Sequence, residues 1–272
     1  MMRRHDLNAD FQWQAPPGPF RRISQDQVRS WNENGYFLLE DAFDSKAIEQ
    51  ITAEIDPFEA AAEEYLITKM GGRHLIARAG EITFTNDLAV RSAKIREFLR
   101  GAVFEDLCHD LIGPDVRLYW DMAVYKKPGT DKLFPWHQDN GYTYVVPQQY
   151  VTCWVALTDA TVENGCPWVL PGAHLQGTLA HRATKLGLVC VDGEPDDAVA
   201  VPVRAGSIAV LSSLVPHTTG SNLTTRTRKT LIAEFVAEGA VSIRRNEDGT
   251  LVRTPCTFPR NIPILTDGHA AT

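Results

Sequence analysis

The sequence has 272 residues, 44% of them hydrophobic and 22% charged, and a formal net charge of −7 at pH 7. This is enough for a buried core of ordinary size, while the acidic balance and the absence of a long basic run argue against a nucleic-acid partner. No apolar run approaches the ~20 residues that a membrane span needs, and the charged start lacks the apolar core of a signal peptide. Five scattered cysteines without a Cys-x-x-Cys pair favour a reducing cytoplasm over a disulfide framework.

The N-terminal part of the chain is predicted to be an irregular arm followed by a helix and a strand. A cluster of prolines and a glycine indicates that residues 1–23 have no regular structure. Ser24 is suited to cap the first turn of a helix, and the Asn34-Gly35 pair is suited to end it. The apolar residues 36–39 follow as a short strand.

Further helices are predicted before residue 115. Asp44 is a suitable N-cap for a helix whose isoleucines share one face, and Pro57 is expected to interrupt that helix. Residues 59–65 then form a separate helical segment, and the glycine-rich residues 71–74 form a loop. Residues 88–112 are predicted to form two helical segments.

From residue 116 onward, strands replace helices. Short segments rich in β-branched and aromatic residues are bounded by turn residues, which is typical of strands. The predicted strands are residues 117–125, 134–139, 150–157, 167–170, 201–203, 207–211 and 229–236. Residues 175–200 form a long, mostly polar insertion, residues 240–250 a further hairpin, and the tail after Pro259 is expected to be irregular.

Helices at the N-terminus and short strands after them predict a mainly β fold of the α+β class. The expected architecture is a double-stranded β-helix, a cupin-like jelly roll with helices packed against one side. After an arm of residues 1–23, residues 24–272 are predicted to form one domain. Within it, residues 24–114 are helical support, residues 115–240 the jelly-roll core and residues 241–272 a C-terminal extension.

The segment of residues 134–139, FPWHQD, carries the strongest chemical signal. Positions i and i+2 of a strand point to the same face, so His137 and Asp139 are expected to project together while Gln138 faces away. They would supply two of the three ligands of a facial site of two histidines and one carboxylate. Such a site binds non-haem Fe(II) and leaves positions open for cosubstrate and dioxygen. Without a third ligand, the two residues are an ordinary ion pair at a strand end.

His217 is the best candidate for a third ligand among the eight histidines. It follows the apolar run of residues 208–211, which indicates a buried strand. A lone histidine is more often structural, so this interpretation depends on its neighbours. Eleven residues later, Arg228 opens another apolar strand, and its planar guanidinium is suited to bind both oxygens of a carboxylate.

A His-x-Asp pair, a distal histidine and an arginine eleven residues beyond it resemble the pattern of the phytanoyl-CoA dioxygenase (PhyH) family, in its ectoine hydroxylase-like branch. These are Fe(II)- and 2-oxoglutarate-dependent oxygenases. The resemblance covers roughly residues 25–240. It includes residues 34–38 (NGYFL), 136–139 (WHQD), 163–168 (ENGCPW) and 171–174 (PGAH). It implies the same jelly-roll fold.

The resemblance also implies roles for the residues already singled out. His137, Asp139 and His217 are expected to bind Fe(II), with 2-oxoglutarate as cosubstrate and O2 as the oxidant. Arg228 is expected to bind the distal carboxylate of 2-oxoglutarate. Arg226, two residues earlier on the same strand face, is a rival that the family spacing does not select.

Five more residues are candidates for the surroundings of the metal. Thr219 is expected to add a hydroxyl to the 2-oxoglutarate carboxylate, unless it is an ordinary turn threonine, and Tyr125 is expected to touch the cosubstrate from the preceding strand. Phe134 is a candidate pocket wall or a core aromatic. Asn140 and Tyr142 are candidates for contact with substrate or belong to the surface of a loop.

The implied function is an Fe(II)- and 2-oxoglutarate-dependent dioxygenase that hydroxylates an aliphatic carbon of a small molecule and releases succinate and CO2. A secondary metabolite, an amino-acid-like compound and an acyl compound are the candidate substrates, and no partner in a membrane is expected. The alternative is a metal-binding cupin-like protein of the same fold without oxygenase turnover. Arg228 favours the oxygenase, because a simple metal site has no need of a carboxylate anchor.

Overall fold

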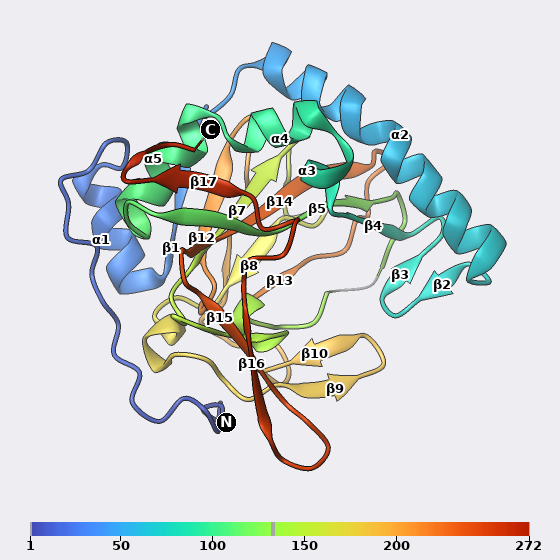
Figure 1. Ribbon diagram of the computed structural model, residues 1–272. Helices are drawn as coiled ribbons and strands as arrows, with labels where there is room; N and C mark the ends of the chain where they lie inside the picture. Colours follow the sequence, from blue (N-terminus) through green and yellow to red (C-terminus); the bar gives the residue numbers. More distant parts are fainter. Residues whose placement is uncertain (1, 132–133, 272) are drawn as a thin grey trace.

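The computed structural model describes residues 2–131 and 134–271 and contains two facing β-sheets with helices on one outer side (Figure 1). The larger sheet is antiparallel, with the strand order β1-β12-β7-β14-β5-β4-β3-β2. Its strands are β1 (Tyr36–Leu39), β2 (Arg73–His74), β3 (Ala77–Arg78), β4 (Ile82–Asn86), β5 (Val116–Lys126), β7 (Val151–Ala156), β12 (Ile208–Ser212) and β14 (Arg228–Ala237). Near the end of the chain, β17 (Pro263–Thr266) pairs with β5, and β18 (His269–Ala270) pairs with β17.

Three smaller groups of strands complete the fold. The sheet that faces the larger one consists of β8 (Pro167–Val169), β11 (Val199–Ala200) and β13 (His217–Thr219). A separate sheet contains β6 (Tyr144–Val146), β15 (Val241–Arg245) and β16 (Leu251–Pro255), and the hairpin of β9 (Arg182–Thr184) and β10 (Gly187–Val189) projects from the body. The mainly β, jelly-roll architecture predicted from the sequence is the one observed.

The helices are α1 (Gln25–Asn34), α2 (Ser45–Lys69), α3 (Leu88–Arg91), α4 (Ala93–Leu99) and α5 (Ala102–Leu111). Ser24 caps α1 through a reciprocal bond with Gln27, and Gly35 ends it in the left-handed conformation, as the sequence predicted. None of the helices in the described ranges combines the length and the apolar character that crossing a membrane requires.

The prediction that Pro57 interrupts a helix was wrong, because α2 continues through it. Proline removes one backbone hydrogen bond from the helix. However, Ile51 and Ile55 before Pro57 and Leu66 after it are buried, and Glu59 accepts a hydrogen bond from Thr83 on β4. Packing on both sides of the proline therefore keeps the helix intact.

Several other local predictions need correction. Residues 71–74 are not only a loop, since β2 and β3 form a short hairpin there, and residues 88–112 form three helices rather than two. Residues 201–203 form no strand and make a single bridge, from Val203 to Ala160. The tail after Pro259 is not irregular, because β17 pairs with the first residues of β5, beyond the part of that edge that β4 covers.

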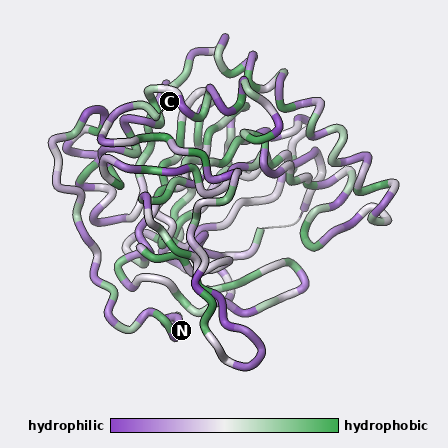
Figure 2. Tube along the Cα trace, in the orientation of Figure 1, coloured by the Kyte–Doolittle hydropathy of each residue, from purple (hydrophilic) through white to green (hydrophobic). Residues whose placement is uncertain are grey.

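The larger sheet separates two apolar cores because side chains alternate along its strands. On its outer face, Leu231, Ala233 and Phe235 of β14 pack under the helices. On its inner face, Trp154 of β7 packs with Val169 of β8 in the facing sheet. Figure 2 shows apolar segments concentrated in the central strands and hydrophilic residues in the loop between β15 and β16. Inward-facing side chains of β14 and β5 therefore lie between the two sheets.

Candidate metal centre

The FPWHQD segment is extended, but it is not the regular strand that the sequence predicted. Within the described residues, His137 alone forms a bridge there, and its partner is His217. The two residues exchange both backbone hydrogen bonds, His137 N–H to the His217 carbonyl at 3.0 Å and the reverse at 2.8 Å. Asp139 begins a 3₁₀ turn, Asp139–Gly141. The bridge sets the two histidines side by side although the strand is absent.

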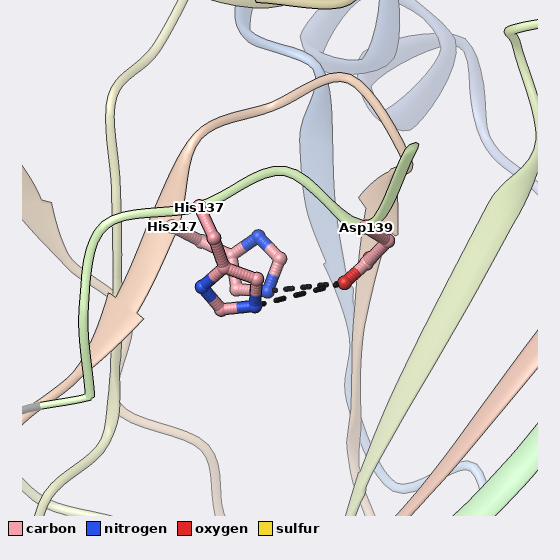
Figure 3. Close-up of side chains that lie close together, drawn as sticks. All are labelled: His137, Asp139 and His217. Carbon is pink, nitrogen blue, oxygen red and sulfur yellow. Dashed lines mark ion pairs between the residues drawn. The ribbon is translucent and has the colours of Figure 1, made fainter. Parts of the chain in front are cut away.

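His137, Asp139 and His217 converge on one point, as the sequence predicted (Figure 3). Their candidate ligand atoms all lie within 4.8 Å of one another. Asp139 Oδ1 lies 3.8 Å from His137 Nε2 and 3.6 Å from His217 Nε2. Two imidazole nitrogens and one carboxylate oxygen in this arrangement fit the facial site of a non-haem Fe(II) protein, with the opposite side left open.

Each histidine is held in the tautomer that a metal ligand needs. His137 Nδ1 lies 2.8 Å from the Pro135 carbonyl, and His217 Nδ1 lies 3.1 Å from the Val215 carbonyl. A carbonyl only accepts, so Nδ1 carries the proton in both rings and Nε2 keeps its lone pair. Burial also lowers the pKa of His137 well below its ordinary value, which keeps this ring neutral.

Thr152 on β7 orients the carboxylate. Its hydroxyl donates to Asp139 Oδ2 at 2.6 Å, which leaves Oδ1 directed toward the two histidines. Thr152 is 2% exposed, so water does not compete for this bond. This contact was not predictable from the sequence, because it depends on how β7 packs beside the 3₁₀ turn.

His181 supports the ligand segment from behind. Its Nδ1 donates to the Leu179 carbonyl at 2.9 Å, and its Nε2 accepts from the backbone N–H of Gln138 at 2.9 Å. A Cβ atom added at Gly141 would lie 2.0 to 2.3 Å from this ring, so the turn after Asp139 needs a glycine there. Gln138 points away from the metal centre, as predicted, and its amide bonds the backbone of Gly177 and Leu214.

Arg228 is the other unusual feature between the sheets. It is 1% exposed, and none of its three guanidinium nitrogens has a hydrogen-bond partner among the described residues. Its charge lies 5.2 Å from the centre of the Trp154 ring. Burial lowers its pKa to about 10, so it remains a cation at neutral pH. A buried cation without an anion is costly, and its planar guanidinium is chemically suited to bind an anion such as a carboxylate.

Lys126, which the sequence analysis missed, lies beside Arg228. The two residues are partners in the register of β5 and β14. Lys126 Nζ lies 3.3 Å from the Thr219 hydroxyl and donates to the Gly220 carbonyl at 2.5 Å. Burial, followed by the charge of Arg228, lowers the pKa of Lys126 to about 7. Thr219 therefore lies next to this pair of cations, in a position to share an anionic ligand with them.

The prediction for Tyr125 was wrong by one residue. Lys126 pairs with Arg228 and faces inward, so Tyr125 faces outward with Lys229. Its hydroxyl donates to Asp56 on α2 at 2.7 Å, and Lys229 lies 5.0 Å from its ring. Tyr125 anchors a helix on the far side of the sheet from Arg228.

Of the three candidates for substrate contact, two lie beside the metal centre and one does not. The ring of Phe134 lies 4.6 Å from that of His137, and the half-exposed Tyr142 lies 5.3 Å from it, edge to face. Both border the metal centre. Asn140 does not, because it is fully buried and bonds Thr178 and Val145, so the expectation of a substrate contact there was wrong.

Comparison with known proteins identifies the family of this chain. The family model of phytanoyl-CoA dioxygenase (PhyH) matches residues 31–230. A methylphosphonate hydroxylase from Gimesia maris is 29% identical over 229 residues, which cover 80% of this chain and 83% of that protein. The structure of the epimerase SnoN in complex with Fe3+, alpha ketoglutarate and nogalamycin RO has a TM-score of 0.69 and 20% identity, over 88% of this chain and 98% of that one. EctD from S. alaskensis with 2-oxoglutarate and 5-hydroxyectoine has a TM-score of 0.65 and 20% identity, over 88% and 83%.

The two structures share the jelly-roll fold with this chain, and the family model extends over most of its length, from α1 to the start of β14. This range contains both histidines, the aspartate and the arginine described above. The chain therefore belongs to the phytanoyl-CoA dioxygenase (PhyH) family.

Proposed function

We propose that this protein is an Fe(II)- and 2-oxoglutarate-dependent dioxygenase that hydroxylates an aliphatic carbon of a small molecule. His137, Asp139 and His217 would hold the metal, and Arg228 would bind the distal carboxylate of 2-oxoglutarate. The observation that carries the proposal is the buried guanidinium of Arg228, which has no hydrogen-bond partner in the part of the chain that the structure describes and lies between the same sheets as the three ligand candidates. The hydroxylase from Gimesia maris supports hydroxylation as the outcome.

When bound, the metal supplies the activation of dioxygen that couples decarboxylation of 2-oxoglutarate to succinate and CO2 with oxidation of a substrate C–H bond. The residues of the chain orient the metal ligands and exclude water from them. The carbonyls of Pro135 and Val215 keep each Nε2 available, and Thr152 holds the carboxylate. Phe134 lies against the His137 ring and excludes water from one side of it.

Lys126 and Thr219 complete the cosubstrate end of the proposed site. The Lys126 ammonium lies 3.3 Å from the Thr219 hydroxyl and opposite Arg228 in register. One carboxylate can accept hydrogen bonds from all three groups, since its two oxygens offer about four lone-pair positions. The chain would thus bind the far end of 2-oxoglutarate with two cations and a hydroxyl.

The alternative function is a metal-binding cupin-like protein without turnover. Nothing in such a protein would use the buried Arg228, whose desolvation only costs stability unless an anion binds. We also propose that the enzyme works in the cytoplasm, because its five cysteines are all buried free thiols. Its partner is a small-molecule substrate.

The test is anaerobic addition of Fe(II) and 2-oxoglutarate to the purified apoprotein, followed by the visible charge-transfer band of the chelate. The native protein should give a band that requires both additions. His217→Ala should abolish it, whereas His269→Ala, at an exposed site, should leave it unchanged. A folded native protein without the band, or with a band that survives in His217→Ala, contradicts the proposal.

A further inference from the structure

The inner face of β14 changes character along its length. At its start, Arg228 and Thr230 are 1% and 0% exposed, because the facing sheet covers them. Further along, Ile232 is partly exposed, and so is Met122, its register partner on β5. The outward-facing Ala233 beside them is fully buried under the helices. The exposure of Ile232 and Met122 is therefore on the inner side of the sheet, where the two side chains form an apolar floor.

Glu234 is the next inward-facing residue of β14. It pairs in register with Trp120 on β5 and with Thr152 on β7, the residue that holds Asp139. The carboxyl group therefore lies on the Asp139 side of the metal centre, at the end of the floor formed by Ile232 and Met122. Glu234 is only 7% exposed.

Nothing in the described part of the protein neutralises this carboxyl group by an ion pair. The nearby Tyr150 hydroxyl makes no hydrogen bond within the described residues, and no described lysine, arginine or histidine forms an ion pair with Glu234. Arg260 stacks on Trp120 at 4.4 Å, yet its ion pair is with Asp87 at 3.9 Å. A carboxyl group that is nine-tenths buried beside a second acid, Asp139, destabilises the fold unless it has a partner.

We propose that Glu234, with Trp120 as its apolar neighbour, forms a recognition subsite for a hydrogen-bond-donating group of the substrate. That group is an amine or a hydroxyl on an otherwise apolar body, which would lie over Ile232 and Met122. A substrate carboxylate or phosphate is disfavoured at this end, because it would be buried near Glu234 and Asp139 without a cation to pair with among the described residues. This inference rests on the proposed function and adds the substrate class to it.

The two ends of β14 would then have different tasks. Arg228 receives an anion at the start of the strand, and Glu234 receives a donor six residues later on the same face. This difference favours the cosubstrate carboxylate at the Arg228 end and a hydrogen-bond donor at the Glu234 end. The metal ligands connect to both ends of β14. Near Glu234, Thr152 donates a hydrogen bond to Asp139, and near Arg228, Thr219 lies two residues after His217.

The experiment uses three probes with the same chain and different head groups: hexylamine, hexanol and hexanoate. Each is titrated anaerobically into the native protein loaded with Fe(II) and 2-oxoglutarate, and binding is followed by the shift of the charge-transfer band. Hexylamine and hexanol should bind roughly tenfold or more tightly than hexanoate, because hexanoate would bury a carboxylate without a cation beside it. Tighter binding of hexylamine than of hexanol would identify the substrate group as an amine, and tighter binding of hexanol would identify it as a hydroxyl.

Glu234→Gln should form the same band without probe and should lose the discrimination against hexanoate. Glu238→Gln is the matched control, because Glu238 is a carboxylate just beyond the same strand that is 43% exposed and paired with Arg117. It should keep the native ranking of the probes.

Three results would overturn the inference: equal binding of the three probes by the native protein, an unchanged ranking in Glu234→Gln, or loss of the band itself in Glu234→Gln, which would place Glu234 in support of the metal. The charge-transfer band measured before any probe is added distinguishes failure of the proposed function from failure of the subsite. Its absence from the native protein refutes the proposed function and this inference with it, whereas a band indifferent to the head group refutes only the subsite.

Discussion

Arg228 and Lys126 lie directly opposite each other on β14 and β5, with both side chains between the two sheets. Two buried cations in register repel each other, and the charge of Arg228 contributes to the lowered pKa of Lys126. An anion bound beside the pair would reduce this repulsion. The pair therefore predicts both the sign of the ligand and a dependence of its binding on pH.

Arg228→Gln should weaken 2-oxoglutarate binding by roughly a hundredfold or more, since a buried charge pair loses one member. Metal binding should remain, because Arg228 touches none of the three ligand candidates. Arg226→Gln is the control, as Arg226 is exposed and precedes β14. Calorimetric titration of 2-oxoglutarate into the metal-loaded proteins measures the effect, and equal affinities in the two variants would contradict it.

Binding of 2-oxoglutarate should take up a proton near pH 8. The pKa of Lys126 without ligand is about 7, so most molecules carry a neutral amine at that pH. A bound dianion favours the ammonium form and raises this pKa, so affinity should fall as the pH rises through the window above about 7. Titrations in two buffers of different ionisation enthalpy report the proton. Lys126→Met should remove the uptake and the exposed Lys185→Met should not.

Thr152→Val should reduce iron affinity by roughly 10- to 100-fold while the protein stays folded, because valine keeps the shape of threonine and removes the donor to Asp139 Oδ2. The Asp139 carboxylate is then free to rotate away from the histidines. Competition with a metal-sensitive dye measures the change. The exposed Thr225→Val provides the comparison, and equal affinities in both variants would show that Thr152 has no role in the site.

Gly141→Ala should destabilise the protein by about 1–3 kcal/mol, the usual cost of overpacking. The new methyl group would overlap the His181 ring, which supports Gln138 between the two ligands of the segment. Thermal unfolding measures the loss. In the double variant with His181→Ala, the two effects should be far from additive, because the smaller side chain removes the clash. Strict additivity would mean that the turn relaxes without contacting His181.

The metal centre was predictable because its signals are local or spaced by strand geometry. His137 and Asp139 needed only the period of two, and His217 needed an apolar run before it and Arg228 after it. Both capping residues of α1, Ser24 and Gly35, were likewise local signals. The period of two correctly predicted that the His137 and Asp139 side chains point to the same site, although their segment is not a regular strand.

The predictions that were wrong concern residues whose positions depend on contacts between distant parts of the chain. Tyr125 and Lys126 are neighbours in sequence, and a shift of one residue exchanges the two faces of a strand. Only the pairing of β5 with β14 shows which of them faces Arg228. Asn140 follows a ligand in sequence, but its direction is set by Thr178, 38 residues away. β17 exists because β5 has a free edge, which nothing in the tail itself reveals.

The backbone bridge between His137 and His217 joins positions 80 residues apart in the sequence. In the unfolded chain, the two ends of so long a loop rarely meet, and two hydrogen bonds compensate for only part of that lost entropy. An ion held by both side chains would act as a crosslink and close the loop a second time. Iron supply would then set the lifetime of the protein as well as its activity, since molecules without the ion would open here first and be degraded sooner.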